Sequence, residues 1–466
     1  MPEPRPPKAA TTVEVGNAQV AESVNVSRVA AAWRSVATRE YLTTLLRGHG
    51  LFGRFGYLVA TQITTVLIGV GYWAYSARSI AAAQVGVAAA AVSAATLIAA
   101  LGVMGVNTVT IVELKDQRPA YQRAFVTTSL LVASPIVAAL TLGVWAISPL
   151  LGASLRTIGH SPVDALLMVL GSVLTLAGTA YDAAGLGLSK SRSRLVRNLI
   201  ASVLKVAGVG IAVALGKRTT VALLVGWNAS LLLSLLTYPM LRLPRVRVSM
   251  ARRRGIIQAY WRLALGHHAV NLALGFMGFI LPAIAAIFVS PKEVAYFSVA
   301  QLIASNSLAL PYLLSMSLFV ESAGDAELLR RNVRKTFPTG VVCSLVVLVI
   351  FEPLAHLVLG VFGATYALHG TVCLRLLLFA GLPYVVKDHF VAIRRAQNRL
   401  TEAAKLGLAS TAFEVMAAAL GAAFGGLNWL CAAWVIAAAA EALCFLPSVL
   451  IVARTRNPKH FQSVRL

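Results

Sequence analysis

Twelve apolar stretches, each long enough to cross the hydrocarbon core of a bilayer as a helix, dominate this sequence. In lipid every backbone polar group must be paired internally, so these spans must be α-helical. The sequence therefore predicts an all-α, polytopic membrane protein with about 12 transmembrane helices. We place the spans, in chain order, at Phe55–Ala77, Gln84–Val109, Gln122–Ile147, Pro162–Leu186, Asn198–Leu215, Thr220–Leu241, Leu263–Val289, Val294–Val320, Thr336–Leu359, Thr371–Ala392, Ala404–Phe424 and Leu427–Val452.

The composition agrees with a membrane protein and argues against nucleic-acid binding. Of the 466 residues, 58% are hydrophobic and 12% are charged, against about a quarter charged in soluble proteins. The mean hydropathy is +0.77. The net charge of +24 comes from basic residues in short loops between apolar spans, which is the pattern of membrane topology. We therefore expect membrane lipids as partners and no nucleic acid.

The loop charges also predict the orientation of the spans. If the N-terminus is cytoplasmic, 33 of the 41 lysines and arginines fall in cytoplasmic segments, five in outer loops and three inside spans. A missed or additional span would invert this pattern from that point on. We therefore expect both termini in the cytoplasm. Arginine outnumbers lysine 31 to 10 and alanine is abundant, which favours a bacterial chain in the cell (cytoplasmic) membrane.

The chain divides into two halves of six spans around an arginine-rich stretch, Leu241–Arg262, that holds seven arginines and no acid. Within the N-terminal tail, residues 26–47 have apolar residues near helical spacing with arginines between them. This pattern fits an amphipathic helix on an anionic membrane surface or an ordinary solvated helix. We predict a cytoplasmic tail (1–52), an N-lobe (53–242), a basic cytoplasmic connector (243–257), a C-lobe (258–453) and a second cytoplasmic tail (454–466).

The two halves align as an internal repeat. The second span begins near Gln84 and closes at Glu113, and the eighth begins after Lys292 and closes at Glu321. The shift is about 208 residues at both landmarks, and basic residues follow each glutamate. Because six spans separate the copies, they have the same orientation, which predicts a parallel repeat of the kind found in transporters. A chance match of short apolar segments is the alternative.

The same residues resemble a known family. The first span ends in Tyr75-Ser-Ala-Arg78-Ser, and a short turn leads to Gln84-Val85-Gly86. The eighth span carries Tyr296-Phe-Ser-Val-Ala-Gln301, Pro311 and Val320-Glu321-Ser322. These features look like the polysaccharide (O-antigen or lipid-linked oligosaccharide) flippases of the multidrug/oligosaccharidyl-lipid/polysaccharide exporter (MOP) superfamily. The resemblance covers roughly residues 53–454.

The resemblance implies two six-helix lobes in a V around a central cavity, lined mostly by the first, second, seventh and eighth spans. It also implies alternating-access transport of a polyprenyl-diphosphate-linked glycan, a precursor of a cell-envelope polysaccharide, from the inner to the outer leaflet. Glycosyltransferases or a polymerase of the same pathway would then be partners, and no cofactor is expected. The chain lacks two further spans that the lipid II flippase usually has. Its first span also lacks the acidic residues usual in the first lobe of drug exporters.

Cations near the ends of the spans are candidates for attracting a diphosphate. Arg54 and Arg262 open the first and seventh spans, Arg78 closes the first, and Arg375 lies one turn inside the tenth. The alternative for each is snorkelling to lipid headgroups. Three further candidates follow Arg262 in the seventh span: His267, His268 and Asn271. Because the two histidines are adjacent on a helix, at most one of them can face a cavity.

Charged residues deeper in the spans are costly and need a reason. Lys205 in the fifth span and Lys387 in the tenth are cavity candidates. Four acids are candidates for ion coupling: Asp182, Asp388, Glu414 and Glu441. Each glutamate could instead fasten helices together as a hydrogen-bonded carboxyl, which we favour. Asp182 is expected to meet a basic loop residue such as Arg192, and Lys387 and Asp388 diverge by about 100° and should not pair.

Other functional classes find less support. The four cysteines lie in apolar spans without a CxxC pair, which indicates packing residues and no metal site or disulfide. Tyr72, Trp73 and Tyr75 read as an interfacial aromatic belt. The longest clear outer loop, Ser148–Ser161, has no carboxylate, which argues against a glycan ligase or polymerase, and no Walker motif is present. The main alternative to a flippase is a small-molecule, drug-type secondary exporter; either is a transporter and not an enzyme.

Overall fold

The computed structural model describes residues 51–113, 117–158, 161–188, 190–237, 250–307, 325–454 and six single positions between 309 and 322. The chain forms two compact units, residues 1–56 and 57–466, and the helices that pack against one another lie in the second. The expected amphipathic helix at 26–47 and residues 243–249 of the expected connector lie outside the described residues.

The described part is built from helices and contains no strand. In the first half the helices are α3 (Leu51–Ser79), α4 (Ala82–Gly102), α5 (Val106–Glu113), α6 (Pro119–Ile147), η1 (Ser148–Leu150), α7 (Gly152–Arg156), α8 (Pro162–Gly187), α9 (Ser191–Ala214) and α10 (Thr220–Leu235). In the second half they are α11 (Met250–Phe288), α12 (Pro291–Ser307), α14 (Ala326–Gly360), α15 (Ala364–Leu378), α16 (Gly381–Ala396) and α17 (Leu400–Arg454).

Each of the predicted spans contains described helix, although several spans are broken and the second half of the eighth lies largely outside the described residues. The second span is α4 plus α5, separated where Met104 (φ 42°) and Gly105 (φ 72°) leave helical geometry. The tenth is α15 plus α16, and α17 holds the eleventh and twelfth on either side of Gly426 (φ 67°). Seven described helices are individually long and apolar enough to cross a membrane, or eight when the bent α11 is included. The expected all-α polytopic fold is confirmed.

Local sequence explains where the main helices begin. Pro119 and Pro162 occupy first-turn positions, where a missing N–H costs nothing. Ser161, Thr219 and Asp325 cap α8, α10 and α14 by accepting a hydrogen bond from the backbone N–H three residues later. These caps fix the register of the spans against the loops.

The internal repeat is visible in the helix starts. From α4 to α12, from α6 to α14 and from α9 to α17 the first residues are 209, 207 and 209 positions apart. The two copies of the second span, α4 and α12, pack against each other where the lobes meet. Gly86 permits this approach, because a Cβ atom there would collide with the Pro291 carbonyl oxygen.

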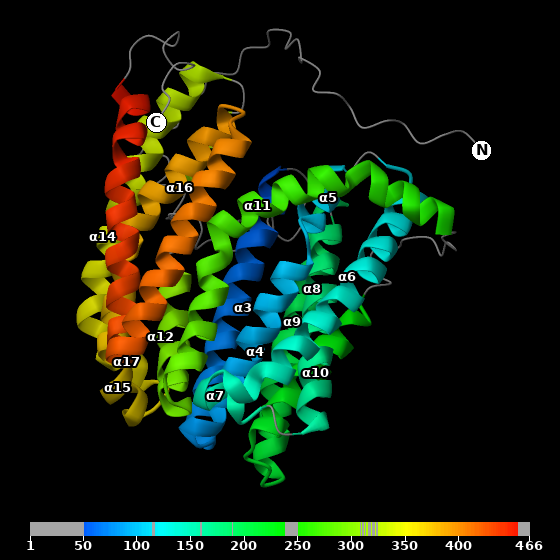
Figure 1. Ribbon diagram of the computed structural model, residues 1–466, viewed down its shortest axis with the longest axis vertical. Helices are drawn as coiled ribbons and strands as arrows, with labels where there is room; N and C mark the ends of the chain where they lie inside the picture. The colour runs from blue at the N-terminus through cyan, green and yellow to red at the C-terminus, as the bar shows by residue number, and fades with distance from the viewer. Residues whose placement is uncertain are drawn as a thin grey trace. The chain divides into compact units, whose positions relative to one another are not determined.

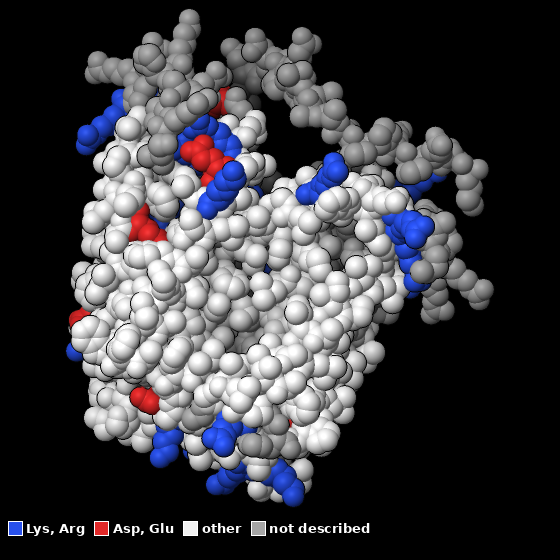
Figure 2. Space-filling view, viewed as in Figure 1, with Lys and Arg blue, Asp and Glu red and all other residues white. Residues whose placement is uncertain are grey.

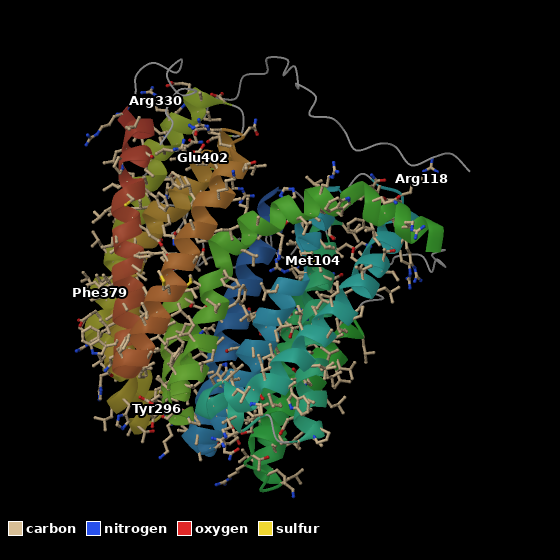
Figure 3. The ribbon with its side chains drawn as sticks, viewed as in Figure 1. Met104, Arg118, Tyr296, Arg330, Phe379 and Glu402 are labelled. Carbon is tan, nitrogen blue, oxygen red and sulfur yellow. The ribbon has the colours of Figure 1, made fainter. Side chains whose placement is uncertain are left out.

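The helices group by lobe within residues 57–466 (Figure 1). Helices α14, α16 and α17 lie together on one side, and α5, α6, α8, α9 and α10 on the other. Arg118, Arg330 and Glu402, all expected to be cytoplasmic, lie at one end of the helices, and Tyr296 lies at the opposite end (Figure 3). A broad, mostly uncharged band separates the basic side chains at the two ends of the visible face (Figure 2). This banding is that of a membrane-spanning protein.

Helix α11 begins at Met250, within the expected connector, and is bent by 62° between Arg253–Leu272 and Gly275–Phe288. Its first half packs on the N-lobe, where the Tyr260 ring meets the Phe125 ring edge-on with centroids 5.4 Å apart. Helix α11 therefore links the lobes, with its first half on one and the rest running into the other.

Candidate functional site

A cavity of about 240 Å³ lies where helices of the N-lobe face helices of the C-lobe. Its walls come from α3, α4 and α10 on one side and from α11 and α12 on the other. These are the first, second, seventh and eighth spans, as the resemblance implied, with one addition from the sixth span. The aromatic and polar lining residues are Trp73, Trp227, Phe279, Ser93, Thr96, Ser298, Gln301, Ser305 and Asn306.

The aromatic wall is a packed cluster. Trp73 and Trp227 have ring centroids 6.3 Å apart, and the buried Tyr72 packs against both at 5.1 and 5.7 Å. Lys205 lies behind this wall, with its ammonium 3.6 Å from the Trp227 ring centroid. Such a cation–π contact satisfies the charge without placing it in the cavity. Lys205 therefore lies against the aromatic wall and is not one of the lining residues.

The polar wall comes from α12 and is neutral. Gln301 is 9% exposed and donates from its amide nitrogen to the Gly278 carbonyl oxygen at 3.2 Å. The Ser298 hydroxyl is buried and makes no hydrogen bond within the described part of the chain. No residue lining the cavity in the described ranges is charged. Neutral donors and acceptors beside indole rings suit a polar ligand with apolar faces.

The lobes are in contact beyond the cavity at the end predicted to face outside. Arg78 at the end of α3 donates from Nε to the Val361 carbonyl oxygen at 2.9 Å, at the C-terminal end of α14. Ser154 donates to the Val289 carbonyl oxygen at 3.2 Å. A guanidinium at a helix C-terminus is favourable because the last carbonyl oxygens lack intrahelical partners. Arg78 thus joins the two lobes in this conformation.

The opposite side of the cavity also has contacts between the lobes. Asn271 donates to the Thr108 hydroxyl at 2.9 Å, and a Cβ atom at Gly105 would collide with the Ala264 carbonyl oxygen. His268 is half-buried and hydrogen-bonds to the backbone of Leu101, while His267 is half-buried and has partners of its own. Asn271 and His268 connect α11 to the broken second span, and neither they nor His267 line the cavity.

Two of the predicted arginines, Arg262 and Arg375, are not among the lining residues either. Arg262 is exposed, with its guanidinium 5.4 Å from the Trp261 ring centroid. Arg375 is 44% exposed and pairs with Glu352 at 3.2 Å. Arg54 lies in α3, but its side chain falls outside the described ones. The substrate roles of these arginines stay predictions.

The C-lobe contains a buried ionic cluster between α16 and α17. Lys387 forms ion pairs with Glu414 and, at 2.9 Å, with Glu441. Glu414 is fully buried and also accepts hydrogen bonds from Tyr384 at 3.0 Å and Trp434 at 2.9 Å. Lys387, predicted as a cavity cation, is thus enclosed in its own lobe.

The same cluster contains more acid than base. Glu441 accepts a hydrogen bond from Ser410, but its second carboxylate oxygen, Oε1, is buried without a hydrogen-bond partner among the described residues. Asp388 is 6% exposed on the neighbouring position of α16 and makes no ion pair with Lys387. The expectation that Lys387 and Asp388 do not pair is therefore confirmed.

Asp182 in α8 belongs to a smaller cluster in the N-lobe. Its carboxylate accepts two hydrogen bonds from Arg197, at 3.0 and 2.9 Å, and others from the Asn198 amide. Arg194 lies within 3.9 Å. The partner is therefore Arg197 of α9, and the expectation of Arg192 is wrong. Arg192 is the second residue of α9. Arg197, five residues later, lies on the face of α9 that meets Asp182 of α8.

Sequence reasoning missed the residues that line the cavity. Trp73 read as part of an aromatic belt, yet it lies in the cavity wall, and Trp227 drew no attention. Gln301 was noticed only as part of a motif. One pattern could have found this wall: Ser298, Gln301, Ser305 and Asn306 recur at helical spacing on one face of an otherwise apolar span.

No protein-family model matches this sequence, and no curated protein matches it. Solved structures do match. The chain is similar to the inward-facing conformation of a multidrug resistance MATE family transporter of the MOP superfamily, at 17% identity and TM-score 0.57, over 85% of this chain and 95% of that one. It is also similar to the lipid II flippase MurJ in an inward closed conformation, at 10% identity and TM-score 0.60, over 87% and 94%.

A third similar structure is a MOP superfamily transporter from Pyrococcus furiosus, at 14% identity and TM-score 0.51, over 86% of this chain and 97% of that one. At these identities the likeness is one of fold. The chain therefore has the two-lobed helical fold of MOP superfamily transporters along most of its length.

Proposed function

We propose that this protein is a secondary transporter that moves a polyprenyl-diphosphate-linked glycan from the inner to the outer leaflet by alternating access. The fold supports transport, because structures with this fold include a drug transporter and a lipid flippase. A glycan head is too polar to cross about 30 Å of hydrocarbon unaided. A polar cavity between two lobes lowers that barrier while the lipid tail stays in the bilayer.

The single observation that carries the choice of substrate is the chemistry of the cavity. A buried cation is most strongly stabilised by a paired carboxylate, and none occurs among the described lining residues. The basic side chain of Lys205 lies against the Trp227 ring, 3.6 Å from its centroid. Its positive field opposes a cationic ligand and favours a neutral or anionic one.

Alternating access is supported by the way the lobes meet. On the predicted outer side the side-chain hydrogen bonds between the lobes, among the described residues, are those of Arg78 and Ser154, together with the close approach at Gly86. Such hydrogen bonds can break and reform as rigid lobes rock.

A small-molecule exporter is the second candidate. It is favoured by the aromatic lining of the cavity and by the shared fold with a multidrug resistance transporter. It differs from the first candidate in one testable respect: it predicts transport of amphiphilic organic molecules and no handling of prenyl-linked glycans.

The deciding experiment uses the full chain in proteoliposomes with a fluorescent polyprenyl-diphosphate glycan and a membrane-impermeant quencher. In the proteoliposomes we expect translocation of the glycan lipid. In cells depleted of the protein we expect a polyprenyl-linked glycan to accumulate on the cytoplasmic face. Translocation of an organic cation with no movement of the lipid would instead support the exporter.

Two separate glycine-to-alanine variants, one test and one control, examine alternating access in the same assay. Gly86→Ala places a methyl group against the Pro291 carbonyl oxygen, so we expect loss of outer closure and of translocation. Gly71→Ala is the matched control, because nothing lies within 4 Å of its Cβ position. Equal activity of the two variants would contradict a cycle that requires this closed contact.

A further inference from the structure

We propose that the cavity between the lobes is a subsite for one neutral sugar ring of the glycan, and that the diphosphate is held outside it. This inference rests on the proposed function and specifies which part of the substrate enters the site. The observations that carry it are the size of the cavity, the pairing of indole and neutral polar surfaces, the unpartnered hydrogen-bonding groups, and the location of charge.

The size of the cavity fits a single ring. At about 240 Å³ it is smaller than the roughly 300–1,000 Å³ of sites that enclose a drug-sized ligand. A glycan of several sugars cannot be enclosed there as a whole. One ring can be, with the remaining sugars and the lipid diphosphate leaving through the opening.

The two walls complement the two kinds of surface on a sugar. A pyranose has apolar C–H faces and a rim of hydroxyl groups. Trp73 and Trp227 supply indole surface for the faces, and Tyr72 packed behind them holds the rings in place. Ser298 and Gln301 on α12 supply donors and acceptors for the rim.

Two polar groups on α12 keep hydrogen-bonding capacity that the described residues do not use. The Ser298 hydroxyl is buried without a partner in the described part of the chain, and a buried hydroxyl in this state is normally satisfied by another polar group. Gln301, more than nine-tenths buried, uses its amide N–H₂ on the Gly278 carbonyl oxygen, which orients its own carbonyl oxygen as an acceptor. A sugar hydroxyl can donate to that oxygen and accept from Ser298.

The charges argue that the diphosphate is outside. Two negative charges enclosed without a paired cation would be strongly disfavoured. Among the described lining residues there is no cation, and the Trp227 ring lies against the Lys205 ammonium. The exposed basic residues lie toward the ends of the helices, where a diphosphate at headgroup depth can meet them (Figure 2).

The test compares two probes on the purified full-length protein in nanodiscs: polyprenyl diphosphate, and the same lipid carrying a single neutral hexose. We expect the hexose to tighten binding of the wild-type protein by about tenfold, the gain of one or two good hydrogen bonds. Trp73→Leu and Gln301→Leu should each remove most of that gain and leave the affinity for the bare lipid unchanged. Trp429→Leu, on a 63% exposed position of α17, is the matched control and should keep the gain.

The outcomes separate the two proposals. If both lipids bind equally well, or if the cavity variants weaken both lipids equally, the sugar subsite is overturned while the flippase function stands. If neither lipid binds or is translocated, the proposed function fails, and the subsite with it. Size-exclusion profiles of the variants show whether folding is retained. Trp73→Phe keeps an aromatic surface and should therefore retain part of the affinity gained from the hexose.

Discussion

Each lobe holds charged side chains together between neighbouring helices, and the two clusters have opposite polarity. In the N-lobe α8 supplies the acid, Asp182, and α9 the base, Arg197. In the C-lobe α16 supplies the base, Lys387, and α17 the acids, Glu414 and Glu441. The repeat places Asp388, 206 residues after Asp182, at the matching point of α16. That aspartate is not the one that forms the ion pair.

The difference lies in burial and in charge balance. Asp182 has a side chain that is 21% exposed, and arginine and amide donors satisfy it. In the C-lobe one ammonium faces two carboxylates that are at most 8% exposed, and one oxygen of Glu441 has no partner in the described part of the chain. The N-lobe cluster is therefore suited to fastening helices. The C-lobe cluster holds one more carboxyl group than cations, and we propose that this carboxyl group takes up a proton.

The largest effect is expected from removing the cation of the C-lobe cluster. Lys387→Met leaves two buried carboxylates without a counter-charge, and such a loss costs about 3–5 kcal/mol. Thermal unfolding of the purified protein in detergent should show a large fall in melting temperature. The fall should be smaller at acidic pH, because protonation removes the uncompensated charge and the folded form then gains stability relative to neutral pH.

Two controls make this result specific. Lys292→Met changes an exposed lysine and should leave the melting temperature unchanged. Adding Glu414→Gln to Lys387→Met should recover part of the loss, because it removes one unpaired charge. A Lys387→Met protein as stable as the Lys292→Met protein would mean that the C-lobe cluster is not an energetic fastener.

A smaller effect is expected in the N-lobe. Asp182→Asn removes the charge that Arg197 pairs with, but Arg197 keeps contacts with Ser234 and Asn198. The asparagine oxygen can still accept from Arg197, so the net loss is about one hydrogen bond to a charged group, or about 1.5–3 kcal/mol, below that of Lys387→Met. The measurement is the same thermal unfolding.

Glu327→Gln is the matched control for Asp182→Asn. Glu327 lies before the ninth span, where the Arg330 hydrogen bond lowers the pKa of its exposed carboxyl. Solvent screens such a pair, so the melting temperature should not change measurably. If Asp182→Asn also has no effect, the contrast between the two clusters is larger than their geometry indicates.

These clusters show how far sequence reasoning reaches. Hydropathy and loop charges predicted the spans, and the repeat spacing predicted the parallel halves, because both depend on order along the chain. The charged residues inside the spans were also identified. Their pairing was not, because it depends on how each helix is rotated about its axis. Arg192 lies nearer to Asp182 in sequence, yet Arg197 lies nearer in space.

The cavity shows the same limit. The spans that line it followed from the family resemblance, but the cations expected there are absent from its described lining. Arg78 bonds across the lobes, and Lys205 faces an indole ring. Tryptophan near a span end is common at membrane interfaces, so sequence alone could not separate Trp73 from an aromatic belt.

A still smaller effect on stability is expected from the exposed ion pair of the C-lobe. Arg375→Ala breaks a pair with Glu352 in which both side chains are more than a third exposed. We expect a change of at most about 1 kcal/mol, with translocation reduced if Arg375 meets the diphosphate. Normal complementation by this variant would remove Arg375 from the substrate candidates, and Arg156→Ala at another exposed outer position is the control.

An effect on stability as small as that of Arg375→Ala, and the sharpest test of the comparison, is expected from Glu441→Gln. The amide can still accept from Ser410, and Lys387 keeps a one-to-one ion pair with Glu414. The free energy of unfolding should therefore change by no more than about 1 kcal/mol, measured by thermal unfolding. If the excess charge of the cluster exchanges a proton during transport, an imposed pH gradient should stimulate the wild-type protein in proteoliposomes and leave the Glu441→Gln variant unaffected. Glu352→Gln, which changes an exposed carboxyl of the same lobe, should keep the response. If the Glu441→Gln protein still responds to the gradient, the C-lobe cluster only holds helices together, as the N-lobe cluster does. The two clusters then differ only in burial and in which helix supplies the acid.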